Sequence, residues 1–182
     1  MALDTNESRA TVRLNLVQEH IQCENRHDLS GIMQTFGSVA EYNDVPWSER
    51  HSGREGVHGY YTQLLESVPD LQIDVRRCHV AGDTIVVEVV IRGTHLGAWR
   101  GLPATGRSLA FPLCGIYTFD QNDRIASERI YYDRATVLRQ LGVFYEPQTA
   151  LGRIVTVLAH PLTMAQALVA NVRPRRDRKA HV

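Results

Sequence analysis

The spacing of the apolar residues changes near residue 70, and this change constrains the fold of the 182-residue chain more than any other feature. Before it, apolar side chains recur every three or four residues, as they do on one face of a helix. After it, residues 84–95, TIVVEVVIRGTH, form a run too rich in valine and isoleucine for a surface helix. Residues 107–120 then alternate, as a half-buried strand does. Helices followed by strands predict an α+β fold.

The first half of the chain predicts three helices. They cover residues 10–24, a segment within residues 27–37, and about residues 54–67. Asp28 is placed to cap the second helix, and Pro69 ends the third. Residues 40–53, between the second and third helices, are predicted to be a polar and aromatic loop punctuated by Pro46 and Gly53.

The second half predicts a curled antiparallel sheet of four or more strands, on which the three helices pack. The strands cover residues 71–80, 84–95, 107–120 and 124–133. Residues 96–107 contain three glycines and a proline, so they form a long connection rather than a tight hairpin. Pro112 within the third strand indicates an edge or a bulge.

After Pro147 the character of the chain changes again. Residues 149–172 are mildly apolar, and Pro161 divides them into two helical pieces. Residues 173–182 carry five basic residues and one acid, which is typical of a solvated tail. We therefore predict a domain at residues 1–147 and a helical extension with a basic tail at residues 148–182. The extension is expected to pack on its own domain or on a second subunit, and a homodimer is expected.

The composition excludes several classes of function. Lys plus Arg equals Asp plus Glu at 20 each, so no global field attracts nucleic acid or an anionic membrane. No apolar run approaches the length of a membrane span, and the three cysteines lack a CxxC pair, so we expect a soluble cytoplasmic protein with reduced thiols. There is no metal-binding, phosphate-binding or dinucleotide-binding motif, so no metal and no cofactor are predicted.

The last predicted strand offers the candidate catalytic residues. Residues two apart share a face, so Arg129, Tyr131 and Asp133 point one way. A face of that composition is either a pocket wall or a solvated surface. Asp133 also precedes residues 134–141, a good helical segment, and aspartate is a favoured helix cap. Whether Asp133 is a cap, a base facing a cavity, or both stays open at this point.

The candidate substrate-binding residues are polar and aromatic side chains of the loops and of the alternating strand. Loops carry function more often than scaffolds do. If the aromatic side chains point inward, they favour an apolar or aromatic substrate of modest size. His58 is included, although isolated histidines are more often solvated than functional. The set is Tyr42, Asn43, Trp47, His58, His95, Trp99, Phe111 and Tyr117.

Three segments together resemble a known family. They are GTHLGAWRGLPATGR, YTFDQNDRIASERIYYD and TVLRQLG, and their order and spacing over residues 11–142 resemble the SnoaL-like polyketide cyclases. That family shares the cone-shaped fold of nuclear transport factor 2 and ketosteroid isomerase. The resemblance implies this fold for the chain, with the extension after Pro147 outside it.

The resemblance also implies a chemistry. The family's aspartate at the end of the last strand is the acid/base of an intramolecular aldol cyclisation, and Asp133 occupies that position. Tyr131 and Arg129 are then candidate donors to the enolate, and Asn43 matches a substrate-contacting residue of the first loop. Where the family often has a histidine near its aspartate, this strand carries Tyr131 and Tyr132.

The predicted function is therefore that of a cofactor-independent enzyme with an apolar pocket. Aldol cyclisation, or isomerisation by proton abstraction next to a carbonyl, is the first hypothesis. An epoxide hydrolase-like enzyme and a non-catalytic small-molecule binding or dimerisation module are the alternatives.

Overall fold

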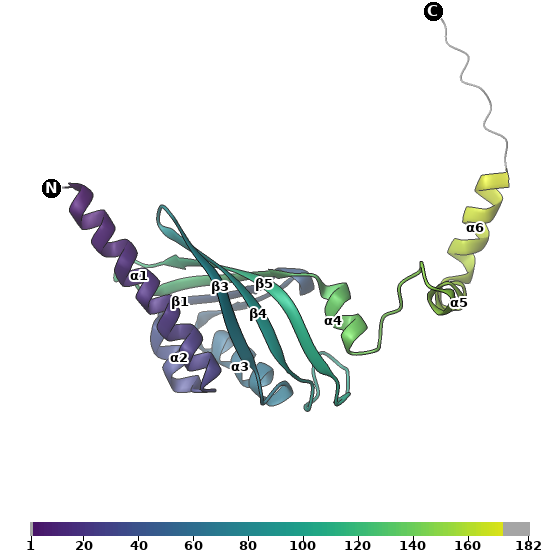
Figure 1. The fold of residues 1–182 in the computed structure, drawn as a ribbon, viewed down its shortest axis with the longest axis horizontal. Helices are drawn as coiled ribbons and strands as arrows, with labels where there is room; N and C mark the ends of the chain where they lie inside the picture. The colour runs from purple at the N-terminus through teal and green to yellow at the C-terminus, as the bar shows by residue number, and fades with distance from the viewer. Residues whose placement is uncertain (1, 173–182) are drawn as a thin grey trace, which may run out of the picture. The chain divides into compact units, whose positions relative to one another are not determined.

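The computed structural model describes residues 2–172, so the basic tail at residues 173–182 lies outside the described residues (Figure 1). The chain divides into two compact units, Met1–Leu141 and Gly142–Val182. The first unit contains, in chain order, α1 (Ala2–Asn25), α2 (Leu29–Thr35), β1 (Phe36–Asp44), the 3-10 turn η1 (Val45–Trp47), β2 (Glu49–Ser52), α3 (Gly53–Ser67), β3 (Gln72–Ala81), β4 (Thr84–Thr94), β5 (Ser108–Phe119), β6 (Ile125–Tyr132) and α4 (Arg134–Gln140). The second contains α5 (Ala150–Ala159) and α6 (Pro161–Val172).

The α+β prediction is confirmed. Within the described residues the strands form one six-stranded sheet in the order β2-β1-β6-β5-β4-β3. β1 and β6 run parallel, and the other neighbouring strands run antiparallel. The three N-terminal helices are also present, and the Asp28 carboxylate accepts a hydrogen bond from the Gly31 N–H, as predicted for the cap of α2.

The prediction of a loop over residues 40–53 is wrong, because β1, η1 and β2 occupy most of it. In β1 the buried residues Ala40, Tyr42 and Asp44 alternate with less buried ones. One of the inward positions is an aspartate, so the alternation of apolar and polar side chains is obscured in the sequence. Pairing with β6, which is distant in the chain, makes this segment a strand.

Pro112 lies in β5, between β4 and β6, and the β4 ladder passes it without a register shift. β6 has already ended beside it, since the last pair of that ladder joins Leu113 to Tyr132. Two residues earlier, the Ala110 N–H donates to the side-chain oxygen of Gln140 from α4, and the Gln140 amide donates to the Ala110 carbonyl. Residues two apart in a strand direct their N–H groups to the same side, so an N–H at position 112 would also point away from β4. The absence of an N–H in Pro112 therefore removes no hydrogen bond from the sheet.

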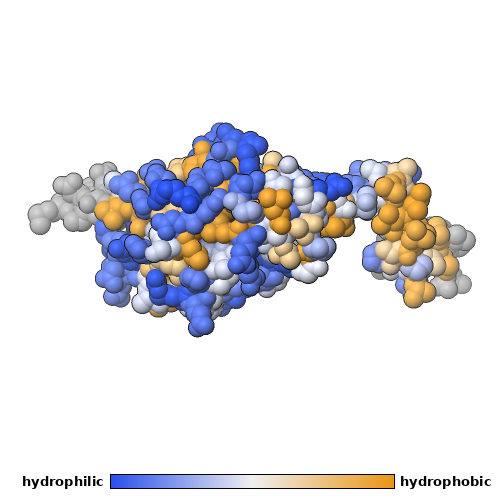
Figure 2. Space-filling view, turned by 90° about the horizontal axis from the view of Figure 1, so that it is seen from below, coloured by the Kyte–Doolittle hydropathy of each residue, from blue (hydrophilic) through white to orange (hydrophobic). Residues whose placement is uncertain are grey.

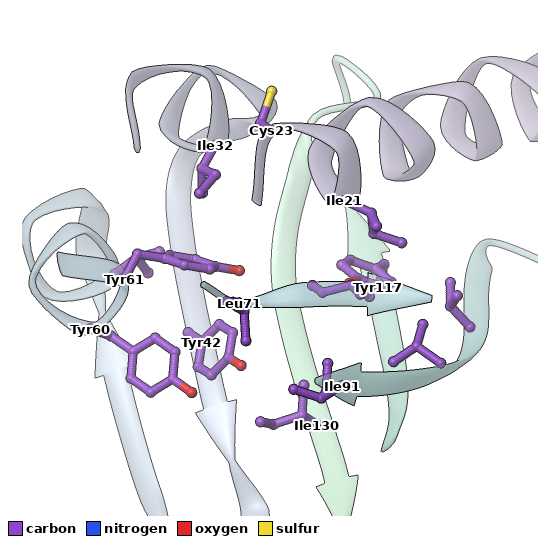
Figure 3. Packing of buried hydrophobic residues seen from close by; sticks show 14 of the residues in the cluster. Ile21, Cys23, Ile32, Tyr42, Tyr60, Tyr61, Leu71, Ile91, Tyr117 and Ile130 are labelled. Atoms are coloured by element: carbon purple, nitrogen blue, oxygen red, sulfur yellow. The ribbon is translucent and has the colours of Figure 1, made fainter. Parts of the chain in front are cut away.

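The helices of the first unit cover one face of the curved sheet, and the core lies between these two layers (Figure 3). β6 turns Glu128 and Ile130 inward, where both are buried, while Arg129 and Tyr131 are exposed on the other face. The parity argument therefore identified the two faces of this strand, and the structure shows that the face with Arg129 and Tyr131 is the solvated one.

In the second unit, Pro161 begins α6, so the predicted division into two helical pieces is confirmed. The Thr149 hydroxyl caps α5 by accepting from the Gly152 N–H. Both helices carry exposed apolar side chains, among them Leu158 and Leu162, and much of this unit's surface is orange in Figure 2. No helix in the described part of the chain combines the length and the apolar character that crossing a bilayer requires.

Candidate functional site

An apolar cavity lies between the helices and the inward face of the sheet. It encloses about 580 Å³ between its walls, with the open mouth included. Its lining comes from α1, α3, the strands β1 and β3–β6, the residue before β3, and the loop after β4. The lining residues are Ile21, Glu24, Tyr42, Tyr60, Leu64, Leu71, Ile73, Val87, Val89, Ile91, Trp99, Phe111, Leu113, Gly115, Tyr117, Glu128, Ile130 and Tyr132. A lining of this composition suits contact with an apolar or aromatic molecule.

Two carboxylates, Glu24 and Glu128, are the acidic groups of this lining, and both are buried. Glu24 comes from the last turn of α1. The next residue, Asn25, fixes that turn to the sheet: its side chain accepts from the Ile73 N–H at 2.6 Å and donates to the Ile73 carbonyl at 3.1 Å. Glu128 comes from the inward face of β6. Tertiary structure thus brings together two acids that are far apart in the chain.

A fully buried histidine, His20, lies between the two carboxylates. Its Nε2 is 3.2 Å from Glu128 Oε2 and 3.6 Å from Glu24 Oε2. Its Nδ1 is 2.7 Å from the hydroxyl oxygen of Thr35, and that hydroxyl donates its proton to the Ile32 carbonyl. The Thr35 oxygen must therefore accept from His20, so Nδ1 carries a proton.

The other ring nitrogen of His20 also carries a proton. The Tyr61 hydroxyl lies 3.0 Å from Nε2 and donates to Glu128 Oε2 at 2.7 Å, so it can only accept from the histidine. Burial lowers the pKa of His20, but Glu24 and Glu128 outweigh this and raise its pKa overall. His20 is therefore an imidazolium held between two acids.

The two acids have different environments. Glu128 accepts from the hydroxyls of Tyr61 and, at 3.0 Å, Tyr117, and it contacts the imidazolium. Glu24 has fewer partners. Burial is the largest effect on Glu24, and together with the nearby charge of Glu128 it raises the pKa to about 8 against the opposing effect of His20. A carboxyl group with a pKa close to neutrality can both take and return a proton.

A group of tyrosines completes the wall beside the acids (Figure 3). The rings of Tyr42 and Tyr60 stack with their centroids 4.0 Å apart, and Tyr61 meets Tyr42 edge to face. Burial raises the pKa of Tyr42, Tyr60, Tyr61 and Tyr117 well above the usual value, so these phenols stay protonated. They are hydrogen-bond donors rather than bases.

The three predicted catalytic residues lie outside this cavity, which corrects their expected position. Asp133 is exposed, and its carboxylate accepts from the Ala135 N–H and the Thr136 hydroxyl as the cap of α4. The Thr136 hydrogen bond is the main reason why its pKa is lowered rather than raised. Tyr131 and Arg129 are exposed on the outward face of β6. The physical reason is the strand's parity, since β6 turns its even-numbered residues inward.

The predicted substrate-binding residues divide into two groups. Tyr42, Trp99, Phe111 and Tyr117 line the cavity, and Trp47 lines an adjoining one with Trp99 and Phe111. The other three do not line it. Asn43 faces outward and donates to Glu41 and Ser127.

The remaining two are His58 and His95. His58 is exposed on α3 and lies beside Thr62. His95 is buried against Thr105, where it holds the loop after β4, and burial lowers its pKa.

Sequence reasoning missed Glu24, Glu128 and His20 as site residues. Two signals were available. His20 and Glu24 are four apart on a predicted helix, so they share a face. Glu128 shares its parity with Ile130 and Tyr132, and an acid in an apolar row is unusual. Among the described residues, no group of three or more His, Cys, Asp or Glu side chains has the geometry to hold a metal ion.

Comparison with known proteins identifies the family. The family model of the SnoaL-like polyketide cyclases matches residues 14–141. A comparison with curated proteins finds no match.

Several solved structures share the fold. The proposed hydroxylase AclR from Streptomyces galilaeus superposes with a TM-score of 0.65 at 21% identity, covering 74% of this chain and 98% of its own. TsrD from Streptomyces laurentii gives 0.63 at 24% identity, with 72% and 95% covered. The proposed polyketide cyclase IdmH from Streptomyces antibioticus gives 0.59 at 23%, with 72% and 99% covered. At these identities the likeness shows the fold alone, and it is the family match that identifies this chain as a member of the SnoaL-like polyketide cyclase family.

Proposed function

We propose that the chain is a cofactor-independent enzyme that moves a proton next to a carbonyl group of a small apolar or aromatic substrate, in an aldol cyclisation or an isomerisation. The observation that carries this proposal is the pair of buried acids, Glu24 and Glu128, joined by the His20 imidazolium at the wall of an apolar cavity. Glu24 is the proposed acid/base, because its pKa of about 8 lies near neutrality.

The proposed reaction returns every group to its starting state. The Glu24 carboxylate takes the proton from the carbon next to the carbonyl and leaves an enolate. In a cyclisation, the enolate carbon then attacks a second carbonyl carbon of the same molecule, and the new alkoxide takes the proton back from Glu24. Tyr60 and Tyr42 line the cavity as protonated phenols, so they are candidate donors to the enolate oxygen.

Exchange of the α-protons of 2-tetralone in D₂O, followed by NMR, tests the proposal. Glu24→Gln keeps the shape of the side chain and removes the base, so the exchange rate should fall about 100-fold or more. Asp133→Asn is the matched control and should leave the rate within a factor of about two, because Asp133 is exposed. A large fall in the rate of Asp133→Asn, with the rate of Glu24→Gln unchanged, would instead identify Asp133 as the base. Binding of 2-tetralone without any exchange would identify a non-catalytic binding module.

A second candidate, hydrolysis of an epoxide, is favoured by one observation. That chemistry needs two acids in one pocket, and Glu24 and Glu128 supply them, with His20 between them. Hydrolysis of styrene oxide that depends on both acids, in a protein that does not exchange 2-tetralone, would select this reaction instead.

We also propose that the protein acts as a cytoplasmic homodimer. All three cysteines lie among the described residues and are free thiols, which fits a reducing compartment. The outward face of the sheet carries two apolar cross-strand pairs, Val90 with Pro112 and Val86 with Ile116, on either side of the pair formed by Glu88 and Cys114. A sheet face with such apolar pairs among charged residues suits contact with a second copy.

A further inference from the structure

Arg100 lies at the centre of a second polar cluster, beside the cavity that holds the acids. Residues 99–102 form a tight turn, in which the backbone groups of Trp99 and Leu102 bond each other at 2.8 and 2.9 Å. Both central residues have positive φ, 52° for Arg100 and 79° for Gly101. An arginine in this conformation is strained, so its surroundings must hold it there.

The contacts of the Arg100 guanidinium stabilise this backbone conformation. Its Nη2 donates to Asp44 Oδ2 at 2.7 Å, and its Nη1 pairs with Glu49. The guanidinium lies over the rings of Trp47, at 4.5 Å, and Trp99, at 5.2 Å. Only 10% of the side chain is exposed. Four neighbours thus fix one guanidinium in one position.

Three side-chain nitrogens and one carboxylate oxygen of this cluster are buried and lack hydrogen-bond partners among the residues that the structure describes. They are Arg100 Nε, Arg100 Nη1, His51 Nε2 and Asp44 Oδ1. Arg100 Nη1 and His51 Nε2 lie close to the Glu49 carboxylate, so Arg100 Nε is the buried donor that has no acceptor beside it. Arg100 and His51 line one side cavity together with Gln63. This side cavity shares Tyr60, Leu64 and Trp99 with the main cavity, so the two adjoin. A buried donor without a partner is costly, and a ligand oxygen would satisfy it.

The charges decide which kind of oxygen fits. Arg100 already pairs with two carboxylates, Asp44 and Glu49, and Glu49 Oε2 also lies 3.6 Å from His51 Nε2. A ligand carboxylate would add a further negative charge to this group and would be repelled. A neutral carbonyl oxygen can accept from Arg100 Nε without that repulsion.

We propose that the side cavity is a subsite for a neutral carbonyl oxygen, of an ester or a ketone, at one end of an elongated substrate. The apolar part of the same substrate fills the main cavity, so the inference rests on the proposed function. Arg100 selects the carbonyl end, and Trp99 separates the two parts of the ligand. A site with a buried unpaired donor rejects ligands that lack the matching acceptor.

The experiment uses the full chain and three matched ligands: methyl 2-naphthoate, 2-naphthoate and 2-ethylnaphthalene. The chain has two tryptophans, and both flank Arg100, so their two indole N–H signals in a ¹⁵N-correlated NMR spectrum report on this site. The ester is expected to bind about tenfold or more tightly than the hydrocarbon, as for a hydrogen bond to a charged donor. The anion is expected to bind more weakly than the ester.

The test variant is Asp44→Asn combined with Arg100→Met, which removes the guanidinium without leaving a buried carboxylate unpaired. In it, the ester and the hydrocarbon should bind equally within about twofold. Arg134→Met is the matched control. Arg134 also lies over Trp47, at 5.0 Å, but it does not line the cavities described above, so the preference for the ester should remain. If the double variant does not fold, Gln63→Leu and His51→Phe should each reduce the preference.

Equal affinities for the ester and the hydrocarbon in the unmodified protein would overturn the proposal. So would tighter binding of the anion, or a preference for the ester that survives in the double variant. These measurements read binding, whereas the 2-tetralone experiment reads proton exchange at Glu24. A failure of the subsite therefore leaves proton exchange unchanged, whereas a failure of the proposed function appears as a loss of exchange, so the two failures are distinguishable.

Discussion

Glu24 shows at the scale of one residue how burial changes a side chain's chemistry. On a solvated helix face a glutamate is an ionised surface group. Here the last turn of α1 places it in the wall of an apolar cavity, and the pKa rises to about 8. His20 opposes this rise, but the loss of water around the carboxylate is the larger effect.

This shift predicts how activity depends on pH. As the proposed base, Glu24 must be ionised to act, so the 2-tetralone exchange rate should rise with pH and reach half of its maximum near pH 8. A rate profile from pH 5 to pH 10 measures it. A rate that is flat over this range would remove Glu24 from the mechanism.

The same shift predicts how stability depends on pH. The folded-state pKa is raised from 4.5 to about 8, so this contribution to stability is complete below about pH 4.5 and is lost as pH rises through 8. Urea unfolding at pH 6 and pH 9 should show a smaller loss in Glu24→Gln than in the unmodified protein. Glu19→Gln, an exposed position on the same helix, is the control and should leave the loss unchanged.

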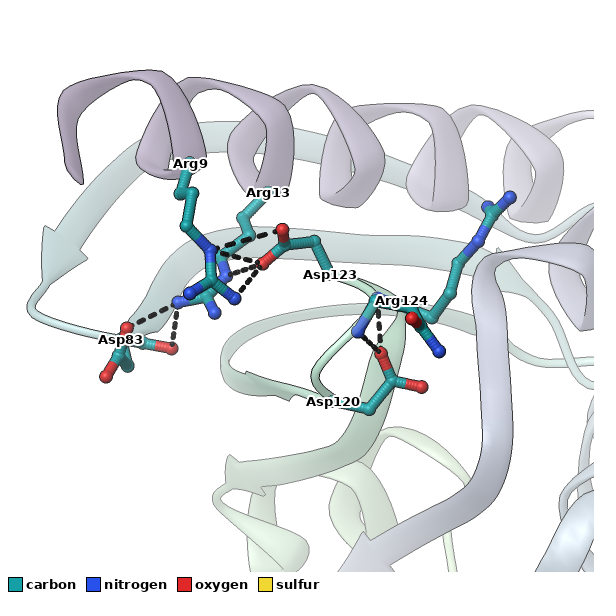
Figure 4. Close-up of polar contacts among 7 residues, drawn as sticks. Arg9, Arg13, Asp83, Asp120, Asp123 and Arg124 are labelled. Atoms are coloured by element: carbon teal, nitrogen blue, oxygen red, sulfur yellow. Dashed lines mark hydrogen bonds and ion pairs between the residues drawn. The ribbon is translucent and has the colours of Figure 1, made fainter. Parts of the chain in front are cut away.

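At the scale of elements, α1 has to be held at both ends because it supplies His20 and Glu24. Asn25 fixes its end to β3. Nearer its start, the nearly buried Arg13 bonds Asp83 in the β3–β4 turn at 2.6 Å and Asp123 in the β5–β6 turn at 2.7 Å (Figure 4). The same guanidinium lies 5.1 Å from the centre of the Phe119 ring.

Arg13→Met should therefore destabilise the fold by about 1–3 kcal/mol, because it removes hydrogen bonds between charged groups but keeps the apolar stem. Arg9 shares Asp123 but is 49% exposed, so Arg9→Met should cost less than about 1 kcal/mol. Urea unfolding of both variants at one pH measures the difference. Equal costs would mean that burial of Arg13 adds nothing to the attachment of α1.

At the scale of the whole molecule, the acids, the cavity and the proposed subsite all lie within the first unit. We therefore propose that the domain at residues 1–147 contains the complete site and folds without the extension.

A chain of residues 1–147 should melt cooperatively, exchange 2-tetralone at the rate of the full chain within about twofold, and remain a dimer by light scattering. If truncation abolishes the dimer, the dimer interface is formed by α5 and α6, whose apolar side chains are exposed, and not by the sheet. Loss of cooperative melting would instead show that the extension is part of the folded domain.

Much of the fold follows from local sequence. The cap at Asp28, the strands β3 to β6 and the start of α6 at Pro161 were all predictable, because their signals are the period of the apolar residues and the geometry of single residues. β1 and β2 were not predictable in this way. Their strand character depends on pairing with β6 and with each other.

The candidate site depends on tertiary structure for one physical reason. Parity sorts the residues of β6 into two faces, but only the packing of the helices decides which face loses its water. The helices bury the face that carries Glu128, whereas Asp133 stays in solvent and caps α4. The sequence by itself determined the fold class, most of the elements and a family resemblance. The positions of Glu24, His20 and Glu128 beside one another, and with them the raised pKa, came from the tertiary structure alone.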